Sequence, residues 1–376
     1  MNALVQNRSD FLDRIRVLLT ALVILHHTAI MYGADGGWYL RYKASGVASA
    51  LPLTLFCAIN QSFFMGMFFL LAGYFSTRSL AHKGAWQFIL DRLLRLGLPT
   101  LFFGFILGPL TIALAEAGPD QSWRALWWYL VTHLSFNIGP LWFAYALLIF
   151  SVIFVALRSL FPNFSWRVSG AVLQHRWIAL FAVVWGLAAF ILRLCVPTGQ
   201  EIFKLQLGYF ASYLLLFFFG CAAAQERVLE KIEKAVALPW GCISLLTIPS
   251  LFIYAILAGA LRGVPFHTNG GWSMPAFAYA MWEPFVACGI MLLLLWHFRV
   301  ASHVSSAWRA VAPLCYAAFI IHAPVVVALG VALKPLQQEL GASSLLMFGI
   351  TGLASVLLSF ALAAVALKLP ILKRIL

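Results

Sequence analysis

Two ionisable side chains, Arg16 and His27, lie in an apolar segment near the N-terminus, eleven residues apart. An α-helix turns about 100° and rises about 1.5 Å per residue, so both side chains project within about 20° of each other, about 16 Å apart along the axis. A neutral imidazole accepts a proton near pH 7, as a general base must. The pair therefore predicts a catalytic site on this helix, and a purely structural role for His27 is the alternative.

Other charged or ionisable residues lie within or beside apolar segments, where burial is costly unless they are paired or hydrated. His26 points about 80° away from the Arg16 face and is the poorer partner. Asp13 precedes Arg16 by one helical turn, a spacing that permits an ion pair. An equal alternative is that both residues lie at the lipid headgroups. Glu283 and His322 are candidates for orienting a catalytic group or binding a substrate, and a structural polar contact is the alternative for each.

A pair of arginines, Arg92 and Arg95, stands in the sequence DRLLRLGLP. Because they are three positions apart in an α-helix, the two side chains share a face. Guanidinium groups bind phosphate oxygens with two parallel hydrogen bonds, so one interpretation is a phosphate-binding site. The alternative is ordinary anchoring of a helix end at the cytoplasmic surface.

The elements that position these residues follow from composition. Apolar residues make up 63% of the 376 residues and charged residues 10%, against roughly 45–50% and about 25% in soluble domains. Because lipid accepts apolar side chains that water rejects, the sequence predicts an all-α, polytopic transmembrane bundle of about ten spans. The apolar runs are continuous rather than alternating, which argues against an outer-membrane barrel. The ten predicted spans are Leu12–Tyr32, Pro52–Ser76, Gly97–Ala117, Pro140–Leu157, Trp177–Cys195, Leu207–Ala224, Trp240–Ala260, Pro275–His297, Pro313–Leu333 and Ser343–Leu367.

The charge distribution predicts an orientation. With the N-terminus in the cytoplasm, 18 of the 25 Lys and Arg residues fall in cytoplasmic segments and 7, including Arg193, in outside loops, as the positive-inside rule requires. Both termini are then cytoplasmic. The excess of cytoplasmic Lys and Arg explains the net charge of +13, so no nucleic-acid partner is expected. No linker divides residues 1–376, so we expect one domain in a bacterial inner membrane. The six cysteines form no CxxC pair, and we expect no metal site and no bound cofactor.

Two predicted outside loops contain the same tripeptide, GGW, at Gly36–Trp38 and Gly270–Trp272. One interpretation is a glycine turn followed by a tryptophan anchored at the membrane interface. The other is an aromatic platform for a sugar, which requires both loops to lie over one cavity.

Six segments in order give the chain a resemblance to the acyltransferase 3 family of integral membrane acyltransferases, and most of all to its glucan-modifying branch. Together they extend over essentially the whole chain. They are FLDRIR with the histidine that follows (Phe11–Arg16 and His27), QSFFMGMFFLLAGYFS (Gln61–Ser76), DRLLRLGLP (Asp91–Pro99), PLWFAYALL (Pro140–Leu148), CYAAFIIHAP (Cys315–Pro324) and LKLPILK (Leu367–Lys373). The chain departs from the family at Phe319, where a tyrosine is frequent, so any role of that hydroxyl is absent here.

The resemblance implies that Arg16 and His27 are essential for acyl transfer. It also implies that Arg92 and Arg95 bind an acyl-CoA co-substrate from the cytoplasm. The remaining candidates for orienting the site or binding the acceptor are Asp13, Trp142, Glu283 and His322.

The expected function is transfer of an acetyl or succinyl group from cytoplasmic acyl-CoA to a hydroxyl of an extracytoplasmic glycan. His27 would act as general base, and an acyl-histidine intermediate is the variant. The main rival is a transporter or flippase for a glycan or lipid precursor, which needs no acyl donor. A lipid-modifying membrane acyltransferase and a membrane scaffold are further alternatives.

Overall fold

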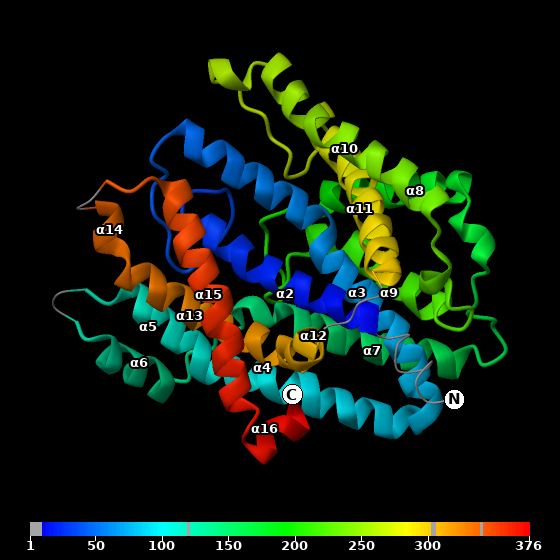
Figure 1. Ribbon diagram of the computed structural model, residues 1–376, viewed down its shortest axis with the longest axis horizontal. Coiled ribbons are helices and arrows are strands. Elements are labelled where there is room, and N and C mark those ends of the chain that lie inside the picture. The colour runs from blue at the N-terminus through cyan, green and yellow to red at the C-terminus, as the bar shows by residue number, and fades with distance from the viewer. Residues whose placement is uncertain (1–9, 119–120, 302–305, 339–340) are drawn as a thin grey trace. The chain divides into compact units, whose positions relative to one another are not determined.

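The computed structural model describes residues 10–118, 121–301, 306–338 and 341–376 (Figure 1). These residues form helices and connecting turns, with two isolated bridges and no strand among them. A helix satisfies every backbone donor and acceptor within one segment, which an apolar run in lipid requires. The prediction of an all-α membrane protein is confirmed.

The principal helices, in chain order, are α2 (Asp10–Met31), α3 (Val47–Arg92), α4 (Leu98–Phe102), α5 (Gly108–Glu116), α6 (Trp123–Thr132), α7 (Trp142–Leu160), α8 (His175–Cys195), α9 (Phe210–Ala223), α10 (Lys234–Leu257), α11 (Met274–Val300), α12 (Ser306–Val311), α13 (Cys315–Ala332), α14 (Lys334–Gln338), α15 (Ser344–Ala366) and α16 (Pro370–Ile375). The shorter π and 3₁₀ segments are η1 (Leu93–Gly97), η2 (Phe103–Leu107), η3 (Gly139–Leu141), η4 (Gly170–Leu173), η5 (Leu207–Tyr209), η6 (Val228–Lys231), η7 (Ala260–Arg262) and η8 (Ala312–Leu314).

The candidate membrane-spanning helices among the described residues are fewer than the ten predicted spans. Eight helical stretches of the described residues are long and apolar enough to cross a membrane. Two predicted spans belong to one continuous stretch, Val47–Glu116, which kinks at Gly84 (φ 74°, ψ 168°). A third, Leu207–Ala223, is apolar but shorter than the rest. The count of ten spans and the cytoplasmic placement of both termini stay predictions.

The chain divides into two compact units. The first unit comprises the described residues of Met1–Ile15, Gln61–Ile89 and Ile149–His303, and the second those of Arg16–Asn60, Leu90–Leu148 and Val304–Leu376. Several long helices contribute residues to both units. Each unit has its own buried side chains and is described by itself.

In the first unit, α8, α10 and α11 pack side by side (green to yellow in Figure 1). Gly289 of α11 allows a close approach of the two helices, because a Cβ there would lie 2.2 Å from the carbonyl oxygen of Trp240 in α10. Arg14 closes the end of α11. Its Nη2 donates to the carbonyls of Phe298 and Ala301, the latter at 3.0 Å, where helix carbonyls have no donor of their own.

In the second unit, α13 and α15 pack side by side (orange and red in Figure 1). Met31 and Tyr32, at the end of α2, share a buried apolar cluster with Val326 of α13 and Met347 of α15. The Tyr32 hydroxyl is 2.9 Å from the Thr351 hydroxyl. These contacts fix the half of α2 that carries His27 against α13 and α15.

Candidate functional site

Three rings from distant parts of the sequence stack together in the second unit. His27 of α2 lies with its Nδ1 2.9 Å from Nε2 of His322 in α13, and the two rings are within 12° of parallel. The indole of Trp38, from the loop after α2, stacks on the imidazole of His27 with centroids 4.0 Å apart and planes 12° apart. The His27 side chain is therefore held between a histidine partner and an aromatic ring.

The hydrogen bonds determine which nitrogens carry protons. Nδ1 of His322 contacts the carbonyl oxygen of Phe319, and a carbonyl only accepts, so this nitrogen carries the proton. In a neutral ring, Nε2 of His322 is then an acceptor, and Nδ1 of His27 donates to it. A neutral His27 therefore has its lone pair on Nε2. The hydrogen bond to His322 uses Nδ1 of His27, which leaves Nε2 to take a proton from a substrate.

Arg16 and His27 belong to the one uninterrupted helix α2, as the spacing argument requires. The Arg16 side chain is half-buried, and its carbonyl accepts a hydrogen bond from Thr20 Oγ1 at 2.9 Å. Side chains on a helix tilt toward its N-terminus, so Arg16 points away from His27. Asp13 is half-buried in the first turn of α2, where the helix dipole stabilises a carboxylate.

The arginine pair lies in an unexpected local structure. Arg92 ends α3, and Arg95 lies in the π-helical segment η1. A π turn contains more residues than an α turn, so residues three apart do not share the face that α-helical spacing predicts. Arg92 is half-buried and within electrostatic range of Tyr316, whereas Arg95 is exposed. Tyr316 precedes His322 by six residues on α13, about 9 Å along the axis.

Trp142 is the first residue of α7, and its half-buried ring meets the Phe143 ring edge-on. The ring of Phe143 in turn contacts Phe319, at a centroid distance of 5.9 Å, and Phe319 contacts His322. Phe143, rather than the predicted Trp142, is therefore connected through Phe319 to the histidine pair.

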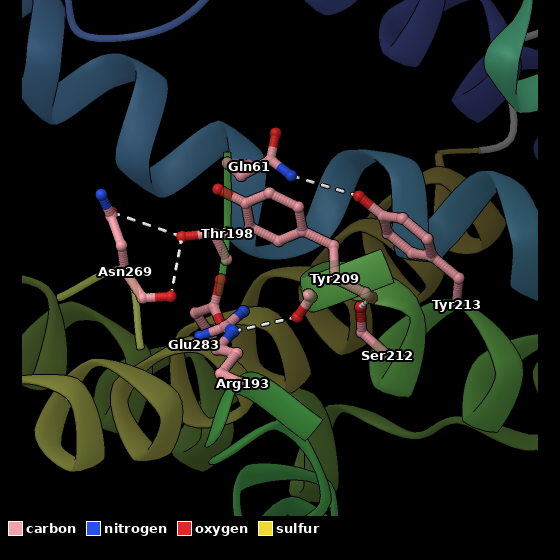
Figure 2. A network of polar contacts seen from close by, with 9 residues as sticks. Gln61, Arg193, Thr198, Tyr209, Ser212, Tyr213, Asn269 and Glu283 are labelled. Atoms are coloured by element: carbon pink, nitrogen blue, oxygen red, sulfur yellow. Dashed lines mark hydrogen bonds and ion pairs between the residues drawn. The ribbon is translucent and has the colours of Figure 1, made fainter. Parts of the chain in front are cut away.

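Glu283 belongs to the first unit and is buried in an ion pair. Its Oε2 lies 2.6 Å from Nη2 of Arg193, and both side chains are at most 5% exposed. Arg193 Nε also donates to the carbonyl of Gly208 at 3.0 Å, and the guanidinium lies over the rings of Tyr209 and Tyr279. Figure 2 shows Arg193 and Glu283 pointing toward each other beside Tyr209.

Arg193 is not among the site residues predicted from the sequence, where the charge distribution assigns it to an outside loop. The structure places this residue in the last turn of α8, 2% exposed. A signal was present, because Arg193 falls inside the predicted span Trp177–Cys195 and Glu283 inside Pro275–His297. Two opposite charges within apolar segments suggest pairing.

His26 lies in a separate polar contact in the second unit. Its Nδ1 is 3.4 Å from Nδ2 of Asn60, which also donates to the carbonyl of Leu22 at 3.2 Å. The neighbouring histidines of α2 thus face different partners, as their 100° separation predicts. In the described part of the chain, no three His, Cys, Asp or Glu side chains are grouped as metal ligands.

The sequence of this chain is similar to that of a known protein family and of individual proteins. A sequence profile of the family described as the acyltransferase domain matches residues 9–364. Glucans biosynthesis protein C of Escherichia coli strain K12 is 31% identical over 147 residues, and that of strain SMS-3-5 is 30% identical. Each match covers 36% of this chain and 37% of the relative. No solved structure matches the chain.

Proposed function

The chain belongs to the acyltransferase domain family, and we propose that it is a multi-pass membrane O-acyltransferase acting on a glycan. In this proposal the acyl group is acetyl or succinyl, the donor is cytoplasmic acyl-CoA, and the membrane is the bacterial inner membrane. The glycan acceptor is inferred from the relatives named for glucan biosynthesis. Acyl-CoA is a co-substrate, and the reaction requires no bound cofactor.

The observation that carries the proposal is the hydrogen-bond chain from the Phe319 carbonyl through His322 to His27. It leaves a lone pair on His27 Nε2 and supports the protonated ring, because His27 Nδ1–H bonds more strongly to His322 when His27 is charged. This is the arrangement of a general base oriented by a second group.

The reaction follows from this arrangement. The acceptor hydroxyl oxygen attacks the thioester carbonyl carbon while its proton moves to His27 Nε2. The carbonyl electron pair moves to oxygen and returns as the carbon–sulfur bond breaks. The leaving thiolate takes the proton from His27 and departs as the coenzyme A thiol. The base is then neutral again.

In this proposal the acyl-CoA donor binds the residues that lie nearer the cytoplasm in the predicted orientation. CoA phosphates are too charged to enter lipid, so Arg92 and Arg95 bind them at the membrane surface. Tyr316, in range of Arg92, lies on the same helix as His322, so α13 connects the phosphate end with the histidines. Arg16, on the His27 face of α2, aligns the donor between them.

The function is tested with purified protein in lipid nanodiscs, given acetyl-CoA or succinyl-CoA and a gluco-oligosaccharide. We expect release of free coenzyme A thiol that depends on the glycan, and a mass increase of one acyl group per modified hydroxyl. Unmodified glycan and unconsumed donor, from protein that remains folded and monodisperse, would contradict the proposal. Uptake of the glycan into sealed vesicles without any donor would favour a transporter instead.

Substitution of either arginine is predicted to weaken binding of the acyl-CoA donor. Arg92→Gln is expected to raise the KM for acyl-CoA about tenfold or more, because a charge-assisted hydrogen bond contributes about 1.5–3 kcal/mol. Arg95→Gln should act in the same direction and less strongly, since its side chain is exposed. The kcat at saturating donor should stay within about twofold, because neither residue contacts the reacting atoms. Initial rates against donor concentration measure both quantities.

Two controls separate phosphate binding from a general loss of charge. Arg374→Gln removes an exposed arginine of α16 and should leave the donor KM unchanged. Acetyl-pantetheine lacks the nucleotide and its 3′-phosphate, so the Arg92 variant and the natural protein should use it equally well. A donor KM for acyl-CoA that does not change in either variant would remove the two arginines from the donor site.

A further inference from the structure

The indole of Trp38 is unusual among the rings at the histidine pair. Its Nε1 is buried and has no hydrogen-bond partner among the described residues, although the ring as a whole is half-buried. An indole nitrogen only donates, and a buried donor without an acceptor loses its bond to water and gains nothing in return. A ligand that accepts a hydrogen bond from this N–H would offset the cost of burying it.

The loop that carries Trp38 is anchored on both sides of it. The Tyr39 hydroxyl donates to Asn137 Oδ1 at 2.6 Å, and the Tyr42 hydroxyl donates to the carbonyl of Gly330 at 3.0 Å. Burial raises the pKa of Tyr42 to about 12 and that of Tyr39 above its ordinary value, so both hydroxyls keep their protons at neutral pH. The position of Trp38 is thus built into the fold.

The segment after α6 also packs closely against Tyr39. Gly139 has φ +43°, and a Cβ there would lie 2.1 Å from the Tyr39 hydroxyl oxygen. Asn137, which accepts from Tyr39, itself donates from its backbone N–H to the carbonyl of Gly104 at 2.9 Å. A glycine at 139 therefore allows the segment after α6 to hold the loop beside the histidines.

The chemistry of this ring suits a carbohydrate. Sugar hydroxyl and ring oxygens are acceptors for an indole N–H, and the apolar face of the indole packs against the C–H groups of a sugar ring. The loop follows the end of α2 that the charge distribution places outside the cytoplasm, the side from which a glycan arrives. CoA phosphates enter from the other end.

We propose that Trp38 binds the acceptor glycan at His27, its Nε1–H donating to a sugar oxygen beside the hydroxyl that His27 deprotonates. This inference rests on the proposed acyl transfer to a glycan and names the acceptor-binding residue. Trp38 stacks on the His27 ring, so a sugar oxygen that accepts from its Nε1–H lies next to His27. Binding then gives the N–H the partner that the free protein lacks.

The test compares Trp38→Phe, which keeps an aromatic ring but removes the donor, with Trp272→Phe. Trp272 ends the other GGW tripeptide, is 85% exposed, and contacts Phe190, which makes it a matched control. Rates are measured with acetyl-CoA and a gluco-oligosaccharide, each varied in turn. We expect Trp38→Phe to raise the KM for the oligosaccharide about tenfold, the order of one neutral hydrogen bond. The donor KM, the kcat at saturating oligosaccharide, and the unfolding temperature should stay unchanged, and Trp272→Phe should resemble the natural protein.

Each other outcome overturns the inference. An unchanged oligosaccharide KM in Trp38→Phe means that the N–H does not contact the acceptor. A fall in kcat at unchanged KM means that the indole acts only by supporting His27. An equal rise of KM in Trp272→Phe means that any surface tryptophan has the effect. In these three cases the natural protein is active and the proposed function stands, whereas an inactive natural protein removes both.

Discussion

His27→Ala is expected to lower the rate of acyl transfer by about 10²–10⁴-fold, the contribution typical of a positioned general base. The loss should fall on kcat, because the imidazole in our mechanism takes the proton in the transition state and adds little to the binding of either substrate. The measurement is thiol release from acyl-CoA in nanodiscs, with both substrates at saturating concentration.

The neighbouring histidine provides the control. His26→Ala removes an imidazole from the next position of the same helix, where it contacts Asn60 rather than His322. We expect this variant to lose less than tenfold in kcat. Equal loss in the two variants, or a natural rate in a folded His27→Ala protein, would refute the assignment of His27 as the base.

Arg193→Met is expected to destabilise the protein by about 3–5 kcal/mol, because it leaves the Glu283 carboxylate buried without its partner. The free energy of unfolding in mixed detergent micelles measures the effect. The double variant Arg193→Met, Glu283→Leu should recover much of this loss, since replacing both members of a buried pair by apolar residues is often neutral or better.

An exposed ion pair in the same unit serves as the comparison. Lys231 and Glu226 lie 3.4 Å apart with side chains 48% and 43% exposed. Lys231→Met should therefore change the free energy of unfolding by about 1 kcal/mol or less, since water and salt screen an exposed pair. If Arg193→Met were no more destabilising than Lys231→Met, or if the double variant were no better than Arg193→Met, the buried pair would not stabilise the fold.

Much of the architecture could be predicted because apolar length alone defines a membrane helix. The predicted span Leu12–Tyr32 corresponds to α2, and Ser343–Leu367 to α15. The shared face of Arg16 and His27 followed from helical geometry within one segment. By contrast, the bend at Gly84 depends on a single positive φ, and the π turn after Arg92 depends on local packing. Neither has a periodic signal in the sequence.

The site was harder to predict than the fold, because its contacts join residues far apart in the chain. His27 and His322 are separated by 295 residues, and a sequence gives no distance between two helices. Each histidine was identifiable as an ionisable residue in an apolar segment, and their pairing required the packing of α2 against α13. Trp38 was identifiable only as part of a repeated tripeptide, with no indication that its indole would cover His27.

The hydrogen bond between His322 and residue 319 has a consequence for how the protein tolerates mutation. The acceptor is the backbone carbonyl of Phe319, an atom that every amino acid carries. Replacing a tyrosine with phenylalanine at this position removes a hydroxyl and leaves the carbonyl that sets the proton arrangement of both histidines. The proton arrangement of the two histidines therefore depends on the main chain at position 319 and not on a side-chain hydroxyl there.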